Sequence, residues 1–214
     1  MQSKLKVSVI IPVFNSEKYI GRCLRSLKRQ SLNKKNYELI VVNDNSTDHS
    51  LNEIKKYRSS NIKIVNNKKN IGLPGSLNSG IKLSTGSLIV RVDSDDWVHE
   101  DFLNILSTFL NLNNTIDAVA CDYTLTDYKE IPISEKNCLK SPIGCGIMFR
   151  VQHLMEMNLY DKKFKYAEEK ALRKKFLKNY KITRVPISLY RYRQHKNNRS
   201  KNKFMVKKYS SILK

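Results

Sequence analysis

The stretch Leu88-Ile89-Val90-Arg91-Val92-Asp93-Ser94-Asp95-Asp96-Trp97 decides the fold. Strand-favouring residues run directly into three carboxylates, and a β-branched, apolar run of this length is typical of a buried strand in an α/β sheet. In open α/β sheets, ligands bind at the carboxyl ends of the strands. The sequence therefore places three acids where a ligand site is expected.

The three acids of this turn repel one another unless a cation or ordered donors compensate their charge. If the chain stays extended, Asp93 and Asp95 point the same way, because side chains two apart share one face of a strand. Such an oxygen-rich position suits Mg²⁺ or Mn²⁺, which commonly carry a substrate's phosphates as further ligands. The alternative is an Asx turn that caps the following helix, with Asp96 or a neighbour as the cap.

Strands and helices alternate before this stretch. Buried strands are expected at Val7–Val13, Tyr37–Val42 and Ile62–Val65, and helices at about residues 17–30, 50–57 and 74–83. Asn15 and Ser16 are candidate caps of the first helix. The order β-α-β-α-β-α-β predicts an α/β fold with a doubly wound, mainly parallel central sheet flanked by helices.

The second half of the chain has a less regular pattern. We expect helices at 102–110 and 167–179, and strands at 118–121, 144–149, 182–185 and 187–192. Residues 122–142 are polar and are expected to form a loop. Glu168 and Glu169 open the basic helix at 167–179, where acids in the first turn favour the helix dipole.

Size and charge limit the classes of protein. The 214 residues fit one domain, and the net charge of +21 is concentrated in residues 136–214, which hold 22 Lys and Arg against 4 acids. Such a patch can face nucleic acid, anionic lipid or a phosphorylated substrate. We expect neither a membrane span nor a signal peptide. The four cysteines lack C-x-x-C spacing, which is typical of a reduced, cytoplasmic protein.

Five motifs together resemble glycosyltransferase family 2, the inverting enzymes of the Rossmann-like GT-A fold. They stand in the family's order and at its spacing. They are Val9-Ile10-Ile11-Pro12-Val13-Phe14-Asn15, Val41-Val42-Asn43-Asp44-Asn45-Ser46-Thr47-Asp48, Asn70-Ile71-Gly72 with Asn78-Ser79-Gly80, Asp93-Ser94-Asp95-Asp96-Trp97, and Glu168-Glu169 with Arg191-Tyr192-Arg193-Gln194-His195. The resemblance implies a GT-A domain at 1–198, with a nucleotide-binding half at 1–103 and an acceptor and catalytic half at 104–198. A basic C-terminal tail follows at 199–214.

The resemblance also implies roles for individual residues. The nucleotide pocket would be lined by Pro12, Val13, Phe14, Asn15, Asp44, Asn70, Gly72, Asp93 and Ser94. Asp44 resembles an acid that accepts a hydrogen bond from a uracil-type imide, and its alternative role is a helix cap. Asp93 and Asp95 resemble ligands of a Mg²⁺ or Mn²⁺ ion. Asp96 would either hold neighbouring groups of the site or contact the donor sugar. Trp97 would lie beside the sugar, although it fits core packing equally well.

The late motifs would serve the chemistry of transfer. Arg193 and His195 resemble the segment that closes over the diphosphate, and the alternative for His195 is a solvated surface side chain. The family's base lies in a Glu-Asp pair at the start of a late helix. Here that pair is Glu168-Glu169, so we assign the catalytic base to Glu169, which is one methylene longer than the usual Asp. Leu77 also departs from the family, since many members carry Arg there.

These features predict a metal-dependent inverting glycosyltransferase that moves a sugar from a nucleotide-diphosphate donor, UDP-linked by the resemblance, to an acceptor hydroxyl. The acceptor would be a glycan or a lipid-linked glycan in bacterial surface glycan synthesis. One alternative is a non-catalytic nucleotide-binding protein of the same fold. A nucleic-acid-binding module is a weaker alternative, because it leaves the three acids unexplained.

The basic tail has a helical pattern of its own. Phe204, Met205, Tyr209, Ile212 and Leu213 would share about half of a helix, opposite Lys203, Lys207 and Lys214. Such a segment suits an anionic leaflet and predicts a cytoplasmic protein at the inner face of the plasma membrane. The alternatives are a tail packed on the body of the protein and a disordered tail.

Overall fold

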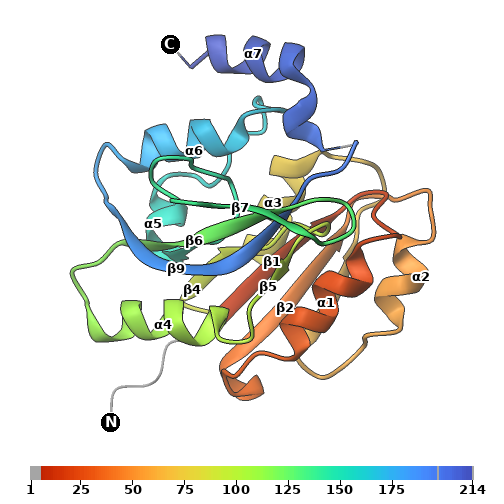
Figure 1. The fold of residues 1–214 in the computed structure, drawn as a ribbon, viewed down its shortest axis with the longest axis horizontal. Coiled ribbons are helices and arrows are strands. Elements are labelled where there is room, and N and C mark those ends of the chain that lie inside the picture. The colour runs from red at the N-terminus through yellow and green to blue at the C-terminus, as the bar shows by residue number, and fades with distance from the viewer. Residues whose placement is uncertain (1–5, 197, 214) are drawn as a thin grey trace.

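The computed structural model describes residues 6–196 and 198–213 and shows a mixed nine-stranded sheet with helices on both faces (Figure 1). The strands are β1 (Val7–Val13), β2 (Tyr37–Asn43), β3 (Ile62–Asn66), β4 (Leu88–Arg91), β5 (Trp97–Val98), β6 (Ala118–Thr126), β7 (Pro132–Lys136), β8 (Ile147–Arg150) and β9 (Ile182–Arg193). The helices are α1 (Ile20–Lys28), α2 (Ser50–Lys55), α3 (Leu73–Lys82), α4 (Phe102–Leu112), α5 (Val151–Glu156), α6 (Glu168–Phe176) and α7 (Lys203–Ser211), with short 3-10 turns at Lys34–Asn36 and Arg199–Lys201.

The first four strands form the predicted parallel, doubly wound half. β1 pairs in parallel with β2 on one side and with β4 on the other, and β2 pairs in parallel with β3. The chain therefore winds outward from β1 in both directions, and the strand order reverses between β1 and β4. Ligands bind outside the carboxyl ends of the strands at such a point.

Alternating side chains of the sheet fill two hydrophobic cores. On β1, Val9 and Ile11 belong to the core under α1, α2 and α4, whereas Ile10 belongs to the core under α3, α5 and α6. Strands buried on both faces read as continuous apolar runs, which explains why the sequence predicted these strands well.

The second half of the sheet differs from the prediction. β8 runs antiparallel to both β4 and β6, so the sheet is mixed and only mostly parallel. Residues 122–142 are not one loop, because β6 continues to Thr126 and forms a hairpin with β7. The two short strands expected around Pro186 are one strand, β9. A register shift between Cys121 and Asp122 leaves Pro186 without a partner on β6, and proline is tolerated in strands at such bulges.

The first helix begins later than predicted, at Ile20, and neither Asn15 nor Ser16 caps it with a side chain. The Ser16 carbonyl accepts the N–H groups of Tyr19 and Ile20, both at 2.9 Å. Asn15 adopts a left-handed conformation (φ 49°), and its side-chain oxygen accepts the N–H of Thr47 at 2.8 Å. The backbone of Ser16 therefore takes part in the turn before α1, whereas the Asn15 side chain connects the end of β1 to the loop after β2.

The tail forms helix α7, which lies above α6 at the top of the molecule (Figure 1). Tyr209 stacks on Tyr166 with ring centroids 6.0 Å apart, and Lys170 donates to Ser210 at 3.3 Å. Phe204 and Ile212 point outward and are 76% and 63% exposed. Of the apolar face predicted for the tail, Tyr209 packs on the body of the protein, whereas Phe204 and Ile212 are exposed to solvent. The contacts of α7 therefore favour the alternative of a tail packed on the body. Lys214 lies outside the described residues.

Within the described ranges, no helix is both long enough and apolar enough to cross a bilayer.

Gly80 lets α3 approach the sheet closely. A Cβ at this position would lie 2.6 Å from the Cγ2 atom of Ile10 and 3.1 Å from that of Val42. Both neighbours are β-branched side chains fixed in buried strands, so they have little freedom to move aside.

We expect Gly80→Ala to lower the thermal midpoint of unfolding. Replacing glycine by alanine in a helix gains about 1 kcal/mol in helix propensity. Overpacking a core costs about 1–3 kcal/mol, and we expect a cost near the upper end of this range because both neighbours are fixed. Calorimetry beside the control Lys82→Ala, at an exposed position of the same helix, measures the difference. An unchanged or higher midpoint for Gly80→Ala would show that α3 does not pack as described.

Candidate active site

A cavity of about 740 Å³ opens at the point between β1 and β4 where the strand order reverses. This volume lies within the range of about 300–1,000 Å³ that is usual for small-molecule sites. The cavity is lined by every residue predicted for the nucleotide pocket, namely Pro12, Val13, Phe14, Asn15, Asp44, Asn70, Gly72, Asp93 and Ser94. Asp95, Glu169 and His195 line it as well. The fold thus brings together residues that lie up to about 180 positions apart in the chain.

Asp44 fixes the loop at Asn70–Gly72. Its Oδ1 accepts the N–H of Ile71 at 2.9 Å and its Oδ2 accepts the N–H of Gly72 at 2.8 Å. Gly72 has φ 78°, a left-handed conformation that glycine adopts without a steric penalty, and α3 starts directly after it. Asp44 therefore does not cap α2. A carboxylate oxygen has two lone pairs, so Oδ2 can accept one further donor from a ligand.

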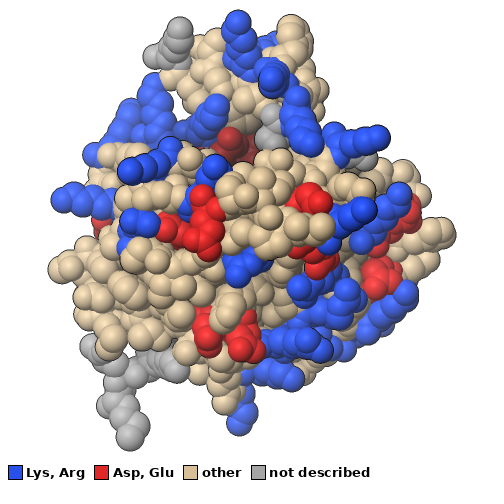
Figure 2. Space-filling model, viewed as in Figure 1, with Lys and Arg blue, Asp and Glu red and all other residues tan. Residues whose placement is uncertain are grey.

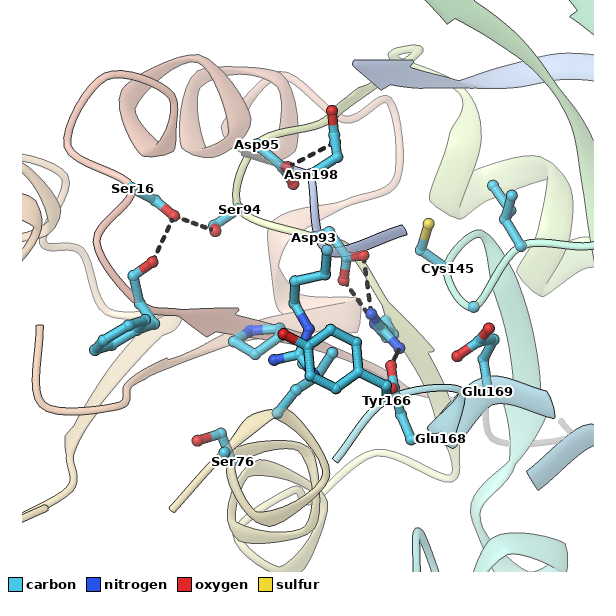
Figure 3. Close-up of a pocket in the computed structure, with 18 of the residues that line it drawn as sticks. Ser16, Ser76, Asp93, Ser94, Asp95, Cys145, Tyr166, Glu168, Glu169 and Asn198 are labelled. Atoms are coloured by element: carbon cyan, nitrogen blue, oxygen red, sulfur yellow. Dashed lines mark hydrogen bonds and ion pairs between the residues drawn. The ribbon is translucent and has the colours of Figure 1, made fainter. Parts of the chain in front are cut away.

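The acidic stretch does not stay extended after Val92, which was the condition for Asp93 and Asp95 to point the same way. The N–H of Asp96 donates to the carbonyl of Asp93 at 3.1 Å, which closes a turn. The carboxylates of Asp93 and Asp95 consequently point in different directions (Figure 3). Ser94, between them, shares a hydrogen bond of 2.8 Å with Ser16 and so ties the turn to the end of β1.

Asp93 is held by Arg91. The Nε and Nη2 atoms of Arg91 donate to the two Asp93 oxygens at 2.6 and 2.9 Å, and Nη1 donates to Glu168 at 3.1 Å. Burial raises the pKa of Asp93, and the neighbouring Arg91 charge opposes that rise. Arg91 was not among the residues predicted for the site. A charged residue inside the buried run 88–92 was the available signal, because a buried charge needs a partner.

Asp95 and His195 form the pair that faces the cavity. Oδ2 of Asp95 lies 2.8 Å from Nε2 of His195, and the Asp95 side chain keeps 24% of its surface exposed. The His195 ring stacks on Tyr19 with centroids 4.7 Å apart. Asn198 lies beside the same carboxylate at 3.5 Å (Figure 3). His195 is thus part of the site wall and not a solvated surface side chain.

Asp96, Trp97 and Arg193 lie behind the wall, outside the lining of the cavity. Asp96 is 1% exposed and accepts the Tyr190 hydroxyl and the Arg193 N–H, both at 2.8 Å. Burial, with Asp95 and Asp93 adding to it, raises the pKa of Asp96 well above its ordinary value. This placement does not support direct contact of Asp96 with a donor sugar.

Trp97 pairs in β5 with Arg191, and the Arg193 guanidinium stacks on its ring at 4.6 Å. The Nε and Nη2 atoms of the same guanidinium donate to the Asp95 carbonyl at 2.8 Å and to Glu130 at 2.9 Å. The structure therefore favours core packing for Trp97. It also makes Arg193 a support of the acidic turn, in place of the predicted diphosphate contact.

Two groups of side chains offer ligands for a metal ion. Asp93, Asp96 and Cys145 place ligand atoms within 4.8 Å of one another. Donors already occupy both oxygens of each of these acids. Burial raises the pKa of the Cys145 thiol well above its ordinary value, whereas metals bind the thiolate. The partly exposed Asp95 with the His195 imidazole fits a Mn²⁺ or Mg²⁺ ion better, because both side chains line the cavity, whereas Asp96 lies behind its wall.

Glu169 stands at the opposite wall, on the second residue of α6 (Figure 3). Glu168 turns toward Arg91, whereas no side chain of the described residues donates a hydrogen bond to the Glu169 carboxylate. Burial and the neighbouring Glu168 raise the pKa of Glu169 above its ordinary value. A carboxylate of this kind is a stronger base than an exposed glutamate. The helix dipole alone therefore does not account for both acids.

Other lining residues were not predicted from the sequence. They include Tyr19, Tyr166, Lys170, Tyr192, Asn198 and Arg199. Except for Tyr192 on β9, these side chains come from loops and helix ends, where no strand or helix period marks which residues face a cavity.

The family described as glycosyl transferase family 2 matches residues 8–181 of the chain. The chain is similar to the poly(ribitol-phosphate) beta-N-acetylglucosaminyltransferase TarS of Staphylococcus aureus, with 39% identity over 109 residues, which are 50% of this chain and 19% of TarS. It therefore matches about a fifth of that relative's length. An uncharacterised glycosyltransferase of Haemophilus influenzae is 28% identical over 218 residues, covering 91% of this chain and 67% of that protein.

Solved structures resemble the fold over most of the chain. S. aureus TarS 1-349 in complex with UDP-GlcNAc has a TM-score of 0.80 at 26% identity, covering 92% of this chain and 61% of that structure. A mannosyltransferase from Pyrobaculum calidifontis in complex with GDP-Man and Mn²⁺ has a TM-score of 0.78 at 17% identity, covering 100% of this chain and 66% of that structure. The second likeness concerns the fold alone.

We expect Asp95→Asn to weaken Mn²⁺ binding at least tenfold, since even residues that only support metal ligands are worth about 10–100-fold in affinity. Cys145→Ser should leave the affinity unchanged. Titration of each purified variant with Mn²⁺, followed by electron paramagnetic resonance of the free ion, measures both effects. The opposite pattern, in which Cys145→Ser weakens Mn²⁺ binding and Asp95→Asn leaves it unchanged, would show that Asp93, Asp96 and Cys145 bind the metal.

Proposed function

The chain belongs to glycosyl transferase family 2, and from that premise we propose that it transfers a sugar from a UDP-linked donor to a hydroxyl group of a glycan acceptor, with inversion at the transferred carbon. One observation carries the proposal: the nucleotide-side residues, the Asp95–His195 pair and the unpaired Glu169 carboxylate line one cavity. Glycosyl transfer needs a nucleotide pocket, charge compensation for the leaving diphosphate and a base, and these three groups can supply them.

The nucleotide would lie over the ends of β1 and β2. Oδ2 of Asp44 retains a lone pair that can accept an imide N–H of uracil, and the loop it fixes at Asn70–Gly72 lies beside it. The solved complex of the related TarS with UDP-GlcNAc supports a UDP donor. Leu77 is fully buried in a hydrophobic core, so this position contributes no cation to the donor.

The diphosphate would face the Asp95–His195 side of the cavity. A Mg²⁺ or Mn²⁺ ion held by these two residues would neutralise charge on the departing diphosphate. Among the residues that the structure describes, the lysine and arginine side chains that line the same cavity are Arg91, Lys170 and Arg199. Arg91 is engaged by two acids, so Lys170 and Arg199 are the cations available to the phosphates.

Glu169 would act as the base. As the acceptor oxygen attacks the anomeric carbon, its proton passes to the Glu169 carboxylate, and the bond to the diphosphate oxygen breaks with its electron pair leaving on UDP. Attack from the side opposite the leaving group inverts the configuration. The raised pKa of Glu169 makes its carboxylate a stronger base than that of an exposed glutamate.

The acceptor is proposed to be a surface polymer that carries negative charge. Figure 2 shows a hollow below α7 with acidic atoms at its floor and Lys and Arg side chains on both sides. The cavity lining includes Lys170 and Arg199, both from the strongly basic C-terminal third. Long-range attraction of this kind draws anionic chains toward a cleft. The TarS relative, named for poly(ribitol-phosphate), supports a phosphate-containing polymer.

A donor screen tests the proposed function. Incubation with UDP-, GDP- and CMP-linked sugars and Mn²⁺ should release UDP and neither GDP nor CMP, and the release should rise when a teichoic-acid-type polymer is added. Binding of UDP without turnover of any donor would favour the non-catalytic alternative. Binding of bulk RNA without binding of UDP would favour a nucleic-acid-binding module.

Glu169→Gln should lower kcat by about 10²–10⁴-fold, the usual contribution of a general base. UDP affinity should stay close to that of the wild type, because the amide keeps the shape of the side chain without its basicity. Glu168→Gln should have a smaller effect. Retention of most activity by Glu169→Gln would mean that another group takes the proton.

The pH dependence of kcat should report the same residue. Activity requires the deprotonated form of Glu169, so kcat should rise with pH through the pKa of this group, and that pKa lies above the ordinary value of 4.5. Glu169→Asp should keep an acidic limb in the profile, whereas Glu169→Gln should lose it. A wild-type profile that is flat down to the ordinary glutamate pKa would contradict the assignment.

A further inference from the structure

Arg91 is a buried cation shared by two acids from different halves of the protein. It stands on β4 and is 8% exposed. Two of its nitrogens bind the Asp93 carboxylate at the end of its own strand, and a third donates to Glu168, 77 positions later on α6, at 3.1 Å. In Figure 3, dashed lines at the labelled carboxylates of Asp93 and Glu168 mark these contacts.

The start of α6 needs such an anchor. Ala167, the residue before the helix, adopts a left-handed conformation (φ 58°, ψ 27°), and no side chain there caps the helix. That conformation is unfavourable for a residue other than glycine and persists only where the surroundings hold it. Glu168 is 5% exposed, and its ion pair with Arg91 is a contact that fixes this end of the helix.

The loop before β8 closes the other side of Glu169. A Cβ at Gly144 would lie 2.8 Å from the Glu169 Cβ and 2.9 Å from the Arg91 Nη1 atom. The backbone at Gly144 therefore packs directly against both side chains. Glu169 has Arg91 and Glu168 behind it and Gly144 beside it, which restricts the directions in which its carboxylate can point.

We propose that Arg91 is a positioning residue that acts through Glu168 to hold the Glu169 carboxylate at the cavity wall. The inference rests on the proposed function, in which Glu169 takes the acceptor proton. It assigns to Arg91 the mechanical link between the acidic turn on the donor side and the base on the acceptor side. Losing the link should displace the base by about 1 Å, a misplacement that can cost about 10²-fold in rate.

A double-mutant cycle separates positioning from general stability. We expect Arg91→Gln to lower kcat about 10²-fold while changing UDP affinity much less. In the Glu169→Gln background the same change should cause no further loss of kcat, because no base remains to be misplaced. Equal losses in both backgrounds, or a loss of UDP affinity as large as the loss of kcat, would overturn the proposal.

Two further variants cover a failure of Arg91→Gln to fold. Gly144→Ala removes no charge but intrudes on Glu169 and Arg91, so it should show the same loss of kcat and the same lack of further loss with Glu169→Gln. Arg184→Gln is the matched control. Arg184 also binds one carboxylate through two nitrogens, Asp122 at 2.9 and 2.5 Å, but it lies outside the cavity lining, and its loss should leave kcat unchanged.

A crystal structure of Arg91→Gln, or of Gly144→Ala, gives a readout that does not depend on turnover. Displacement of the Glu169 carboxylate relative to the wild type supports positioning even if no sugar donor is turned over, in which case the proposed function alone fails. A Glu169 carboxylate in its wild-type place would overturn the positioning role, whatever the enzyme does.

Discussion

Asp93, Asp95 and Glu169 line one cavity and Asp96 lies behind its wall, and the way each of these carboxylates is compensated determines what the site can do. Asp93 is bound by Arg91, and Asp96 is bound by the Tyr190 hydroxyl and the Arg193 backbone. Acids this close raise one another's pKa unless donors offset the repulsion. Fixed donors hold Asp93 and Asp96, so they support the turn. Asp95 and Glu169 remain available to ligands, one on each side of the cavity.

The donors that compensate these acids also connect the halves of the fold. Tyr190 and Arg193 lie on β9, which pairs with β5 directly after the acidic turn. Arg91 reaches from β4 to α6 through Glu168. The parallel half of the sheet therefore supplies most of the residues predicted for the nucleotide pocket, and late segments of the chain carry the groups that hold the acidic turn in place. A buried charge that loses its partner is strongly destabilising, which makes these links rigid.

The sequence predicted the parallel half of the fold well, because β1, β2 and β4 are apolar runs and each ends in a polar cluster. The same pattern indicated that Asp44, Asp93 and Asp95 line the cavity, whereas Asp96 lies behind its wall and Glu169 was assigned from the family resemblance. It did not predict the hairpin of β6 and β7, since Thr and Asp interrupt the apolar pattern there. The directions of Asp93 and Asp95 were missed because a turn at Asp96 ends the strand period. The burial of Arg193 depends on Glu130 and Trp97, contacts between distant segments that no local pattern reveals.

Anomalous diffraction from crystals grown with UDP and Mn²⁺ tests the central claim most directly, namely that charge compensation leaves Asp95 as the acid open to a metal and a nucleotide. The account predicts one manganese peak within coordinating distance of Asp95 and His195. The UDP diphosphate should lie beside this peak and the uracil ring over Asp44. A peak among Asp93, Asp96 and Cys145, or UDP bound away from the ends of β1 and β2, would contradict it.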